Sequence, residues 1–458
     1  MKKFVILSAL LACASFTLVA CGGGSSSDSG MTSGSSQAQV FVTGEDAPLP
    51  SVLAFNITMS GIALNNSSGS VQLLSEPTTV DFARLVGLRS LLGFNSVAAG
   101  TYNSVTFTMA SPVITYLNLG TTPPSTGTIN GTLTTSTVTV ALDHPLTVDA
   151  NGLAGLHMEF DLRQSLQVDM AGQVTGTVNP HIEVEPVKAS DDDGQITELA
   201  GGLSTVNVGG NSFVIQRIGG KDVTIKVNSK TEFSGTWALA TMMTPAFVSV
   251  EGSVQADGSV LASDVEVVST THAFVSGRIV AVNPTTGPVQ TVTLFVGEEL
   301  PAISTIPVDS IATIDVSTVN NFDVCFFDNW FTNIFFNNSA LVAGQRVFIG
   351  GDYEGTTFTP HMVSLRRQGV EGDLVASSVQ ITSSNRGSFQ IQNNHLLGYV
   401  LGAPLTVQTG DGTRFHNVNG LTGLQGAGSA KVLARGLILK DQSSGNAQLW
   451  AHHVRILQ

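Results

Sequence analysis

His157-Met158-Glu159-Phe160-Asp161-Leu162-Arg163 is the stretch of the chain that indicates its fold most clearly. Apolar and polar residues alternate along it, so that Met158, Phe160 and Leu162 share one side of an extended strand. The other side carries the polar residues, His157, Glu159, Asp161 and Arg163. A period of two is typical of a strand with one face in the core and one face in water. We therefore expect an antiparallel sheet whose polar side chains face solvent.

The same alternation recurs elsewhere in the first half of the chain. It is found at residues 52–59 and again at residues 102–109. Only residues 80–94 show the spacing of about 3.6 residues that is typical of a helix, in Phe82, Leu85, Leu88 and Leu92. We predict that residues 37–187 form a β-sandwich with one short helix.

A weak internal repeat occupies the second half of the chain. Strands similar to a Val-x-Val-x-Gly pattern occur at residues 248–252, 347–351 and 432–436. A Thr-x-Phe segment stands upstream of the first and the third of them, at residues 231–233 and 413–415. Each unit holds five or six short strands in roughly 70–95 residues, which is the size of a small Greek-key or OB-like barrel.

The predicted fold class is therefore all-β, with an N-terminal β-sandwich followed by three small OB-like or Greek-key β-barrel repeats. The predicted segments are a lipoprotein signal peptide at 1–20, a Gly/Ser-rich tether at 21–36, the β-sandwich at 37–187, a polar linker at 188–195, and barrel repeats at 196–269, 270–366 and 367–458. The second repeat differs from the others by a long aromatic insert.

Two resemblances accompany this organisation. Asp46-Ala47-Pro48, residues 80–85 and Gly100-Thr101-Tyr102 resemble the motifs of an uncharacterised module found at the N-terminus of bacterial surface lipoproteins. That resemblance covers residues 37–165 and implies a sandwich of the transthyretin or carbohydrate-binding type; no catalytic residue is carried over from the family. Residues 196–458 resemble a second uncharacterised family of small exported β-barrels that often occur in tandem.

The N-terminus has the features of a secreted lipoprotein. Met1-Lys2-Lys3 and the apolar residues 4–11 are typical of a signal peptide. Leu18-Val19-Ala20-Cys21 resembles the bacterial lipobox, which implies that Cys21 is acylated, with palmitate or similar chains, after cleavage before it. Gly22 in place of an aspartate resembles the lipoproteins sent to the outer membrane. We expect a protein of the cell envelope, anchored to the outer membrane through Cys21, because several acyl chains give a stable anchor.

Composition and charge exclude several classes of protein. Hydrophobic residues make up 42% of the chain and charged residues 12%, which argues against a disordered chain or a coiled coil. The net charge is −14, and no Lys or Arg occurs between Arg89 and Arg163. We therefore expect no nucleic-acid partner, because phosphate binding needs clustered basic side chains.

The sequence contains no motif of known catalytic or metal-binding mechanics, such as Gly-x-Ser-x-Gly or His-Glu-x-x-His. The run at residues 191–194 resembles part of a calcium loop, but Ala189 and Ala200 would fall at ligand positions, so it is interpreted as a solvated linker. His452 and His453 are neighbours, and in a regular strand they would point to opposite faces. We predict no metal and no cofactor.

The most unusual segment spans residues 321–338, which contain seven aromatic side chains. One interpretation is an apolar plug that packs against the barrels, since aromatic residues dominate protein cores. The other is an exposed patch that contacts a partner. The candidate partner-binding residues are Phe326, Phe327, Trp330 and Phe331. Cys325, in the same segment, is expected to behave as a small buried hydrophobic residue.

These observations favour a non-enzymatic binding or structural module, a row of domains that presents surfaces to a glycan or an envelope protein. The alternative is an envelope enzyme that acts on glycans through carboxylates, such as Glu159 with Asp161 or Glu183 with Glu185. Two carboxylates on one face of one strand project in parallel, whereas a glycosidase pair converges from opposite sides of a bond. The sequence leaves the ligand and the oligomeric state open.

Overall fold

The computed structural model describes residues 37–47, 49, 52–118, 125–170, 173–191, 194–217, 222–269, 273–324, 334–393 and 396–457. These residues belong to one compact unit of the chain. Strands dominate them, so the predicted all-β class is confirmed. No helix among the described residues has the length and apolarity that a membrane span requires. The predicted signal peptide, Cys21 and the tether lie outside the described residues.

The first part of the chain folds as two main sheets that enclose a common core. Its strands are β1 Gln37–Ala47, β2 Val52–Asn66, β3 Gly69–Gln72, β4 Thr78–Asp81, β5 Ser90–Ala98, β6 Gly100–Asn118, β7 Ser125–Asn130, β8 Thr132–Leu133, β9 Thr137–Val148, β10 Leu153–Asp161, β11 Leu166–Val168, β12 Val174–Val178 and β13 Ile182–Val187. One sheet has the order β13-β10-β1-β5, and the other has the order β3-β2-β6-β7, with β4 beside β2 and β9 beside β6. A small third sheet has the order β11-β12-β8.

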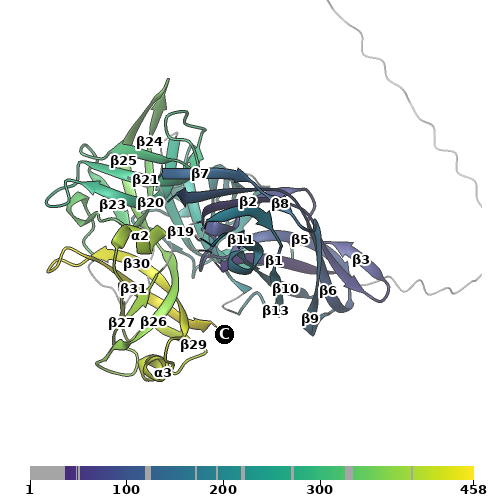
Figure 1. Ribbon diagram of the computed structural model, residues 1–458. Helices are drawn as coiled ribbons and strands as arrows, with labels where there is room; N and C mark the ends of the chain where they lie inside the picture. Colours follow the sequence, from purple (N-terminus) through teal and green to yellow (C-terminus); the bar gives the residue numbers. More distant parts are fainter. Residues whose placement is uncertain are drawn as a thin grey trace, which may run out of the picture. The chain divides into compact units, whose positions relative to one another are not determined.

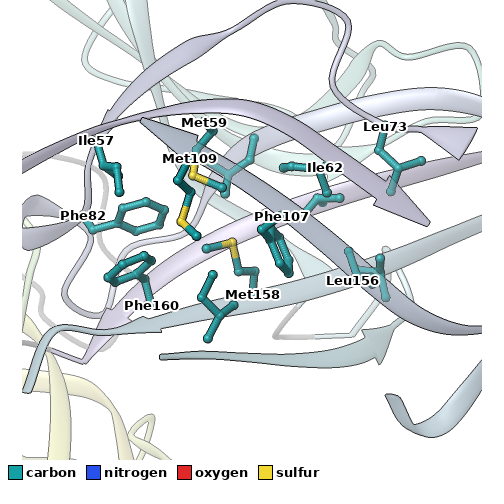
Figure 2. Packing of buried hydrophobic residues seen from close by; sticks show 14 of the residues in the cluster. Ile57, Met59, Ile62, Leu73, Phe82, Phe107, Met109, Leu156, Met158 and Phe160 are labelled. Atoms are coloured by element: carbon teal, nitrogen blue, oxygen red, sulfur yellow. The ribbon is translucent and has the colours of Figure 1, made fainter. Parts of the chain in front are cut away.

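The core of this sandwich contains the apolar side of the stretch that indicated the fold. Met158, Phe160 and Leu162 are buried, as the alternation predicts. The ring centroid of Phe160 lies 4.9 Å from that of Phe82 and 5.3 Å from that of Phe55, and Figure 2 shows Phe82 and Phe160 side by side. Aromatic pairs at such distances add to the stabilisation that burial provides.

The helix predicted for residues 80–94 is wrong. Strand β4 ends at Asp81, a single 3-10 turn (η1, Phe82–Arg84) follows, and β5 begins at Ser90. Gly87 has a φ of +64°, which interrupts any regular helix between the two strands. The apolar side chains of this stretch instead enter two different cores. Phe82 and Leu92 lie in the sandwich core, whereas Leu91 packs against residues 196–267.

The second part of the chain forms three sheets, which we call the first, second and third barrel. The first contains β14 Ile196–Asn207, β15 Ser212–Arg217, β16 Val223–Lys226, β17 Glu232–Phe233, β18 Phe247–Val254 and β19 Val260–Ser269. The second contains β20 Ala273–Asn283, β21 Thr291–Leu300, β22 Ile311–Asp315, β23 Asn321–Val324, β24 Arg346–Glu354 and β25 Thr357–Arg366. The third contains β26 Gln368–Ile381, β27 Gly387–Gln392, β28 Leu405–Thr409, β29 Arg414–His416, β30 Lys431–Lys440 and β31 Ala447–Leu457. The short helical segments are α1 Leu162–Ser165, η3 Leu239–Thr241, η4 Asn338–Ala340, α2 Leu396–Leu401 and α3 Gly420–Gly426.

All three barrels have the same strand order. The sheets read β16-β15-β14-β18-β19-β17, β22-β21-β20-β24-β25-β23 and β28-β27-β26-β30-β31-β29; Figure 1 draws the third in green to yellow. In the first and third barrels the third and last long strands also pair in parallel, β16 with β19 and β28 with β31. In these two repeats this closes a five-stranded Greek-key barrel with the connectivity of an OB-fold, and the second repeat has the same strand order, so the predicted OB-like repeats are confirmed.

The glycine that ends the repeated Val-x-Val-x-Gly pattern has a structural cause. In each barrel the pairing of the last two long strands shifts by one residue at this glycine, which leaves a β-bulge on the opposite strand. A Cβ atom on the glycine would lie about 2 Å from a carbonyl oxygen of the bulged strand, namely 2.2 Å at Gly252, 2.3 Å at Gly351 and 1.9 Å at Gly436. The extra residue of the bulge is Ser263, His361 or His452.

The repeat also accounts for part of the aromatic segment. Phe322 pairs in register with Val363, as Phe233 does with Val265 in the first barrel, so Phe322 belongs to the common framework. Its ring meets that of Phe336 at 5.8 Å, edge to face. Phe336 is 8% exposed and Phe335 is 78% exposed, so one side chain packs into the barrel and its neighbour faces solvent. The candidate residues Phe326, Phe327, Trp330 and Phe331 lie outside the described residues, as does Cys325.

The polar linker does not separate the sandwich from the first barrel as expected. Phe41 and Leu91 of the sandwich lie in the same buried cluster as Ile196 and Leu199 of the first barrel. Because this core is shared, the sandwich and the first barrel stabilise each other.

Substitution of Gly436 by alanine tests the role of the bulge. Gly436→Ala should lower the free energy of unfolding by about 1–3 kcal/mol, the usual cost of forcing an atom into a packed site. Gly426→Ala is the matched control, because Gly426 ends α3 and a Cβ there would meet nothing within 4 Å. Denaturant unfolding of both variants measures the difference. Equal stability of the two variants would refute the assigned role of this glycine.

Candidate functional site: a charged cavity where the barrels meet the sandwich

The segment at residues 82–90, from η1 to the start of β5, carries the sandwich into contact with the first and second barrels. The guanidinium of Arg84 pairs with the carboxylate of Glu298 on β21. The main-chain N–H of Arg89 donates to the hydroxyl of Thr197 at 2.7 Å, and the carbonyl of Arg89 accepts from the N–H of Thr197 at 3.1 Å. Through these hydrogen bonds a short stretch of the sandwich backbone lies beside β14.

The same segment contacts the third barrel through two glycines. A Cβ on Gly369 would lie 2.9 Å from the Cα of Gly87, and one on Gly87 would lie 3.0 Å from the Cα of Gly369. Only residues without side chains allow the two backbones to approach so closely. The sandwich therefore contacts all three barrels, whereas in the expected row of domains it would contact only the first.

Buried ion pairs join the first barrel to the second. Arg346 of β24 forms a double hydrogen bond with Glu198 of β14. Arg366 pairs with Glu266 of β19, and the hydroxyl of Ser364 donates to the same carboxylate at 2.7 Å. Such pairs hold a fixed geometry, because a guanidinium and a carboxylate meet through two parallel hydrogen bonds.

An aromatic cluster lies beside these ion pairs. Phe247 of the first barrel stacks on Phe274 of the second, with 3.7 Å between ring centroids. Phe348 meets Phe274 edge to face at 5.5 Å, and the guanidinium carbon of Arg366 lies 4.4 Å from the centroid of Phe348. The first and second barrels are thus held by apolar, cation–π and ionic contacts together.

The polar side of β10 is buried against the third barrel, so the expectation that it faces solvent is wrong. His157 is 3% exposed and Asp161 is 6% exposed. Arg163, at the end of the same stretch, pairs with Glu371 of β26 at 3.1 Å. On the neighbouring strand β1, Glu45 accepts from Arg435 of β30 at 3.2 Å. The polar side of this sheet, which the alternation predicts to face solvent, therefore forms ion pairs with the third barrel.

Equivalent positions in the three barrels carry different charges. In the first barrel one row of in-register residues is acidic and consists of Glu232, Asp264 and Glu251. The equivalent residues of the third barrel are basic and consist of Arg414, His453 and Arg435. Those of the second barrel are neutral and consist of Asn321, Met362 and Gly350. Directly opposite residues on adjacent strands point to the same face, so we call the first set the acidic row and the second the basic row.

A cavity of about 290 Å³ lies between these rows. Two members of the acidic row, Glu251 and Asp264, and all members of the basic row line it. Gly87 and Leu88 of the sandwich segment form another part of its wall. We call it the junction cavity. A smaller cavity of about 100 Å³ borders the same segment, and its lining includes Arg84 and Arg346, whose guanidinium groups already form the ion pairs described above.

Both neighbouring histidines line the junction cavity, contrary to the expectation from a regular strand. His452 is the extra residue of the β-bulge, and a bulge rotates the side chains that follow it. The ring centroids of His452 and His453 are 6.4 Å apart, and that of His416 lies 4.3 Å from His453. No group of three or more His, Cys, Asp or Glu side chains in the described part of the chain could hold a metal ion.

Burial shifts the pKa of several carboxyl groups at these contacts. Burial raises the pKa of Glu251 to about 7, against the opposing effect of Arg367, and Asp264 adds to the rise. Burial also raises the pKa of Glu371 to about 7. Glu45 behaves differently, because Arg435 and Arg89 outweigh its burial and lower its pKa to about 2. The side chain of Glu45 is therefore ionised in its pair, while at Glu251 the effect of burial outweighs that of its partner Arg367.

Of the carboxylates considered for catalysis, Glu159 and Asp161 lie on β10, and Glu183 and Glu185 lie on β13. Glu159 and Glu183 lie in register on adjacent strands, so their side chains project from the same face. Burial, with the charges of Glu45 and Glu183, raises the pKa of Glu159 to about 7. Asp161 instead caps α1, accepting from the N–H of Gln164 at 3.0 Å. Asp191 is exposed and accepts from the N–H of Lys188 at 3.2 Å, as in a turn.

Apart from His452 and His453, the residues of the junction cavity were not singled out from the sequence, although a signal for them existed. Glu251 and Arg435 each precede the glycine of the repeated pattern, and Asp264 and His453 each follow the bulged residue. Comparison of the repeats position by position shows that the charge reverses. It does not show that the two rows face one cavity, because that depends on how the barrels pack.

The titration of Asp46 gives a test of the charged contacts. Asp46 is 4% exposed, and neither carboxylate oxygen has a hydrogen-bond partner among the described residues. Burial, and the nearby charges of Glu371, Glu159 and Asp81, raise its pKa well above the usual value. The native state therefore retains a proton that the unfolded chain loses above about pH 4, and stability falls as the pH rises.

We expect Asp46→Asn to be more stable than the wild type at pH 8 by roughly 1–3 kcal/mol, because Asp46 must take up a proton on folding at that pH whereas the amide is neutral in both states. At pH 4 the difference should nearly vanish, because the native state keeps its proton and about half of the unfolded chains then carry it as well. Urea unfolding at the two pH values measures it, with the exposed Asp411→Asn as the control. A variant less stable than the wild type at pH 8 would show that the carboxylate is held ionised.

Comparison with known protein families agrees with two uncharacterised modules. Residues 37–177 match the model of a family described as "Domain of unknown function (DUF4382)", which covers most of the sandwich. Residues 193–266 match the model of a family described as "Domain of unknown function (DUF5666)", which covers the first barrel. No curated protein matches the chain.

Proposed function

We propose that this protein is a lipid-anchored, non-enzymatic binding protein of the cell envelope, and that the junction cavity is its binding site. The lipobox ending at Cys21 supports the anchor, and the absence of Asp at position 22 supports the outer membrane as its location. The Gly/Ser-rich residues 22–36 would let the folded body stand away from the lipid surface.

The observation that carries the proposal is the composition of the cavity wall. Side chains from the first and third barrels, together with Arg366, Arg367 and the sandwich segment, meet at one hollow of about 290 Å³. Ligand pockets of proteins occur preferentially where domains meet, and have volumes of about 300–1,000 Å³. Polar groups that converge on such a hollow can fix the orientation of a small ligand.

The ion pairs of the carboxyl groups favour binding over catalysis. A pKa near 7, as at Glu159, Glu251 and Glu371, is typical of general acids and bases and would favour an envelope enzyme acting on glycans. Here Glu371 pairs with Arg163 and Glu251 pairs with Arg367. These two pairs join separate modules and give Glu371 and Glu251 a structural role.

An envelope protein or a glycan remains a candidate partner for the aromatic segment. Phe335, which is 78% exposed, lies four residues after Phe331, the last of the candidate residues Phe326, Phe327, Trp330 and Phe331. This second contact would be independent of the junction cavity.

The experiment compares full-length protein with its Cys21→Ser variant in a Gram-negative host. The wild type should incorporate a fatty-acid analogue and sediment with outer membranes, whereas Cys21→Ser should do neither. Cys325→Ser is the matched control and should behave as the wild type. The released Cys21→Ser body should show a concentration-dependent rise in melting temperature with at least one class of small polar solute, and that solute should be recovered unchanged. Labelling that persists in Cys21→Ser, or chemical conversion of every stabilising solute, would overturn the proposal.

A further inference from the structure

The junction cavity has walls of opposite charge. Glu251 and Asp264 stand on the side of the first barrel, and Arg414, His453 and Arg435 stand on the side of the third. The fold does not require these charges, because the second barrel has the same strand order with neutral residues at the equivalent positions. The walls are therefore a property of this pair of barrels.

Part of the charge on the walls is already balanced within the protein. Arg435 pairs with Glu45, and Glu251 pairs with Arg367. Among the described residues no salt bridge joins Arg414 to a carboxylate, and its side chain is exposed at the cavity. Burial leaves Glu251 with a raised pKa despite Arg367, so a further cation nearby would stabilise its ionised form.

Two buried polar atoms at the cavity lack hydrogen-bond partners among the described residues. They are Nε of Arg435, a residue that is 6% exposed, and Oε1 of Gln368, a residue that is 1% exposed. One is a donor and the other is an acceptor. An unpartnered buried polar atom costs about 1–3 kcal/mol, so a ligand that offers both an acceptor and a donor would remove two such costs.

We propose that the junction cavity binds a small zwitterion, with its ammonium group toward Glu251 and Asp264 and its carboxylate toward Arg414 and Arg435. The assignment rests on the proposed binding function and specifies its ligand class. A ligand with only a negative charge would meet the acidic row, and a ligand with only a positive charge would meet the basic row. A zwitterion alone matches both walls, since complementary charge selects partners by rejecting the wrong ones.

A set of three matched probes tests this directly by isothermal titration calorimetry on the soluble Cys21→Ser protein. The probes are the dipeptide alanyl-alanine, its N-acetyl derivative, which is only an anion, and its C-terminal amide, which is only a cation. The zwitterionic dipeptide should bind at least tenfold more tightly than either derivative. That preference corresponds to about 1.4 kcal/mol or more.

Two variants assign each end of the ligand to its wall. Glu251→Gln should weaken binding of the dipeptide at least tenfold and leave binding of the N-acetyl derivative unchanged. Arg414→Gln should weaken binding of the dipeptide and leave binding of the amide unchanged. Glu354→Gln and Arg386→Gln, which remove exposed charges outside the cavity, are the matched controls and should change nothing.

The outcomes separate the ligand class from the binding function. If the N-acetyl derivative or the amide binds as tightly as the dipeptide, the zwitterion is wrong while the cavity remains a binding site. If binding is the same in both cavity variants, the site lies elsewhere and the assignment of the cavity is wrong. If none of the probes binds at millimolar concentration, the zwitterion is wrong. The proposed function then fails as well if no other polar solute raises the melting temperature.

Discussion

The arrangement of this protein depends on charges that are buried where the modules meet. Glu45 and Arg435 are almost fully buried, and they join the first strand of the sandwich to the third barrel. A buried ion pair adds little to stability compared with apolar packing, but removing one partner leaves a buried charge at a cost of about 3–5 kcal/mol. Pairs of this kind therefore select one arrangement among many, because any other packing would leave charges without partners.

The segment at residues 82–90 connects these contacts. Its side chains enter the sandwich core at Phe82, its glycine at position 87 touches the third barrel, and the backbone of Arg89 extends the first. Arg84 reaches the second barrel through Glu298. Within nine residues this segment contacts the sandwich core and all three barrels. Its apolar side chains are spaced as in a helix because they pack against different neighbours, and the segment forms no regular helix.

Periodicity predicted the strands well, because alternation depends on local burial. It identified β2, β6, β10 and the repeated strands of the barrels, and the repeat predicted three OB-like units. It was wrong about His157 and Asp161, since a polar residue that faces another module has the same pattern as one that faces water. It was also wrong about His452, because the bulge that redirects this side chain depends on pairing with Gly436.

The charge reversal between the barrels is visible in the sequence only after the repeats are aligned, and the cavity it forms is visible only in three dimensions. Glu251 and Arg435 occupy the same position of the same fold, so the two barrels share their backbone pairing and differ in what they present. Two copies of the same fold that differ in charge at equivalent positions can thus form a cavity with one acidic and one basic side. Neither barrel contains that site by itself.

The shared core and the buried ion pairs predict that the sandwich and the barrels unfold as one cooperative unit. Differential scanning calorimetry of the Cys21→Ser protein tests it most directly. The account predicts one transition, with a calorimetric enthalpy equal to the van't Hoff enthalpy. Two or more independent transitions would show that the modules unfold separately and that the buried ion pairs do not couple them.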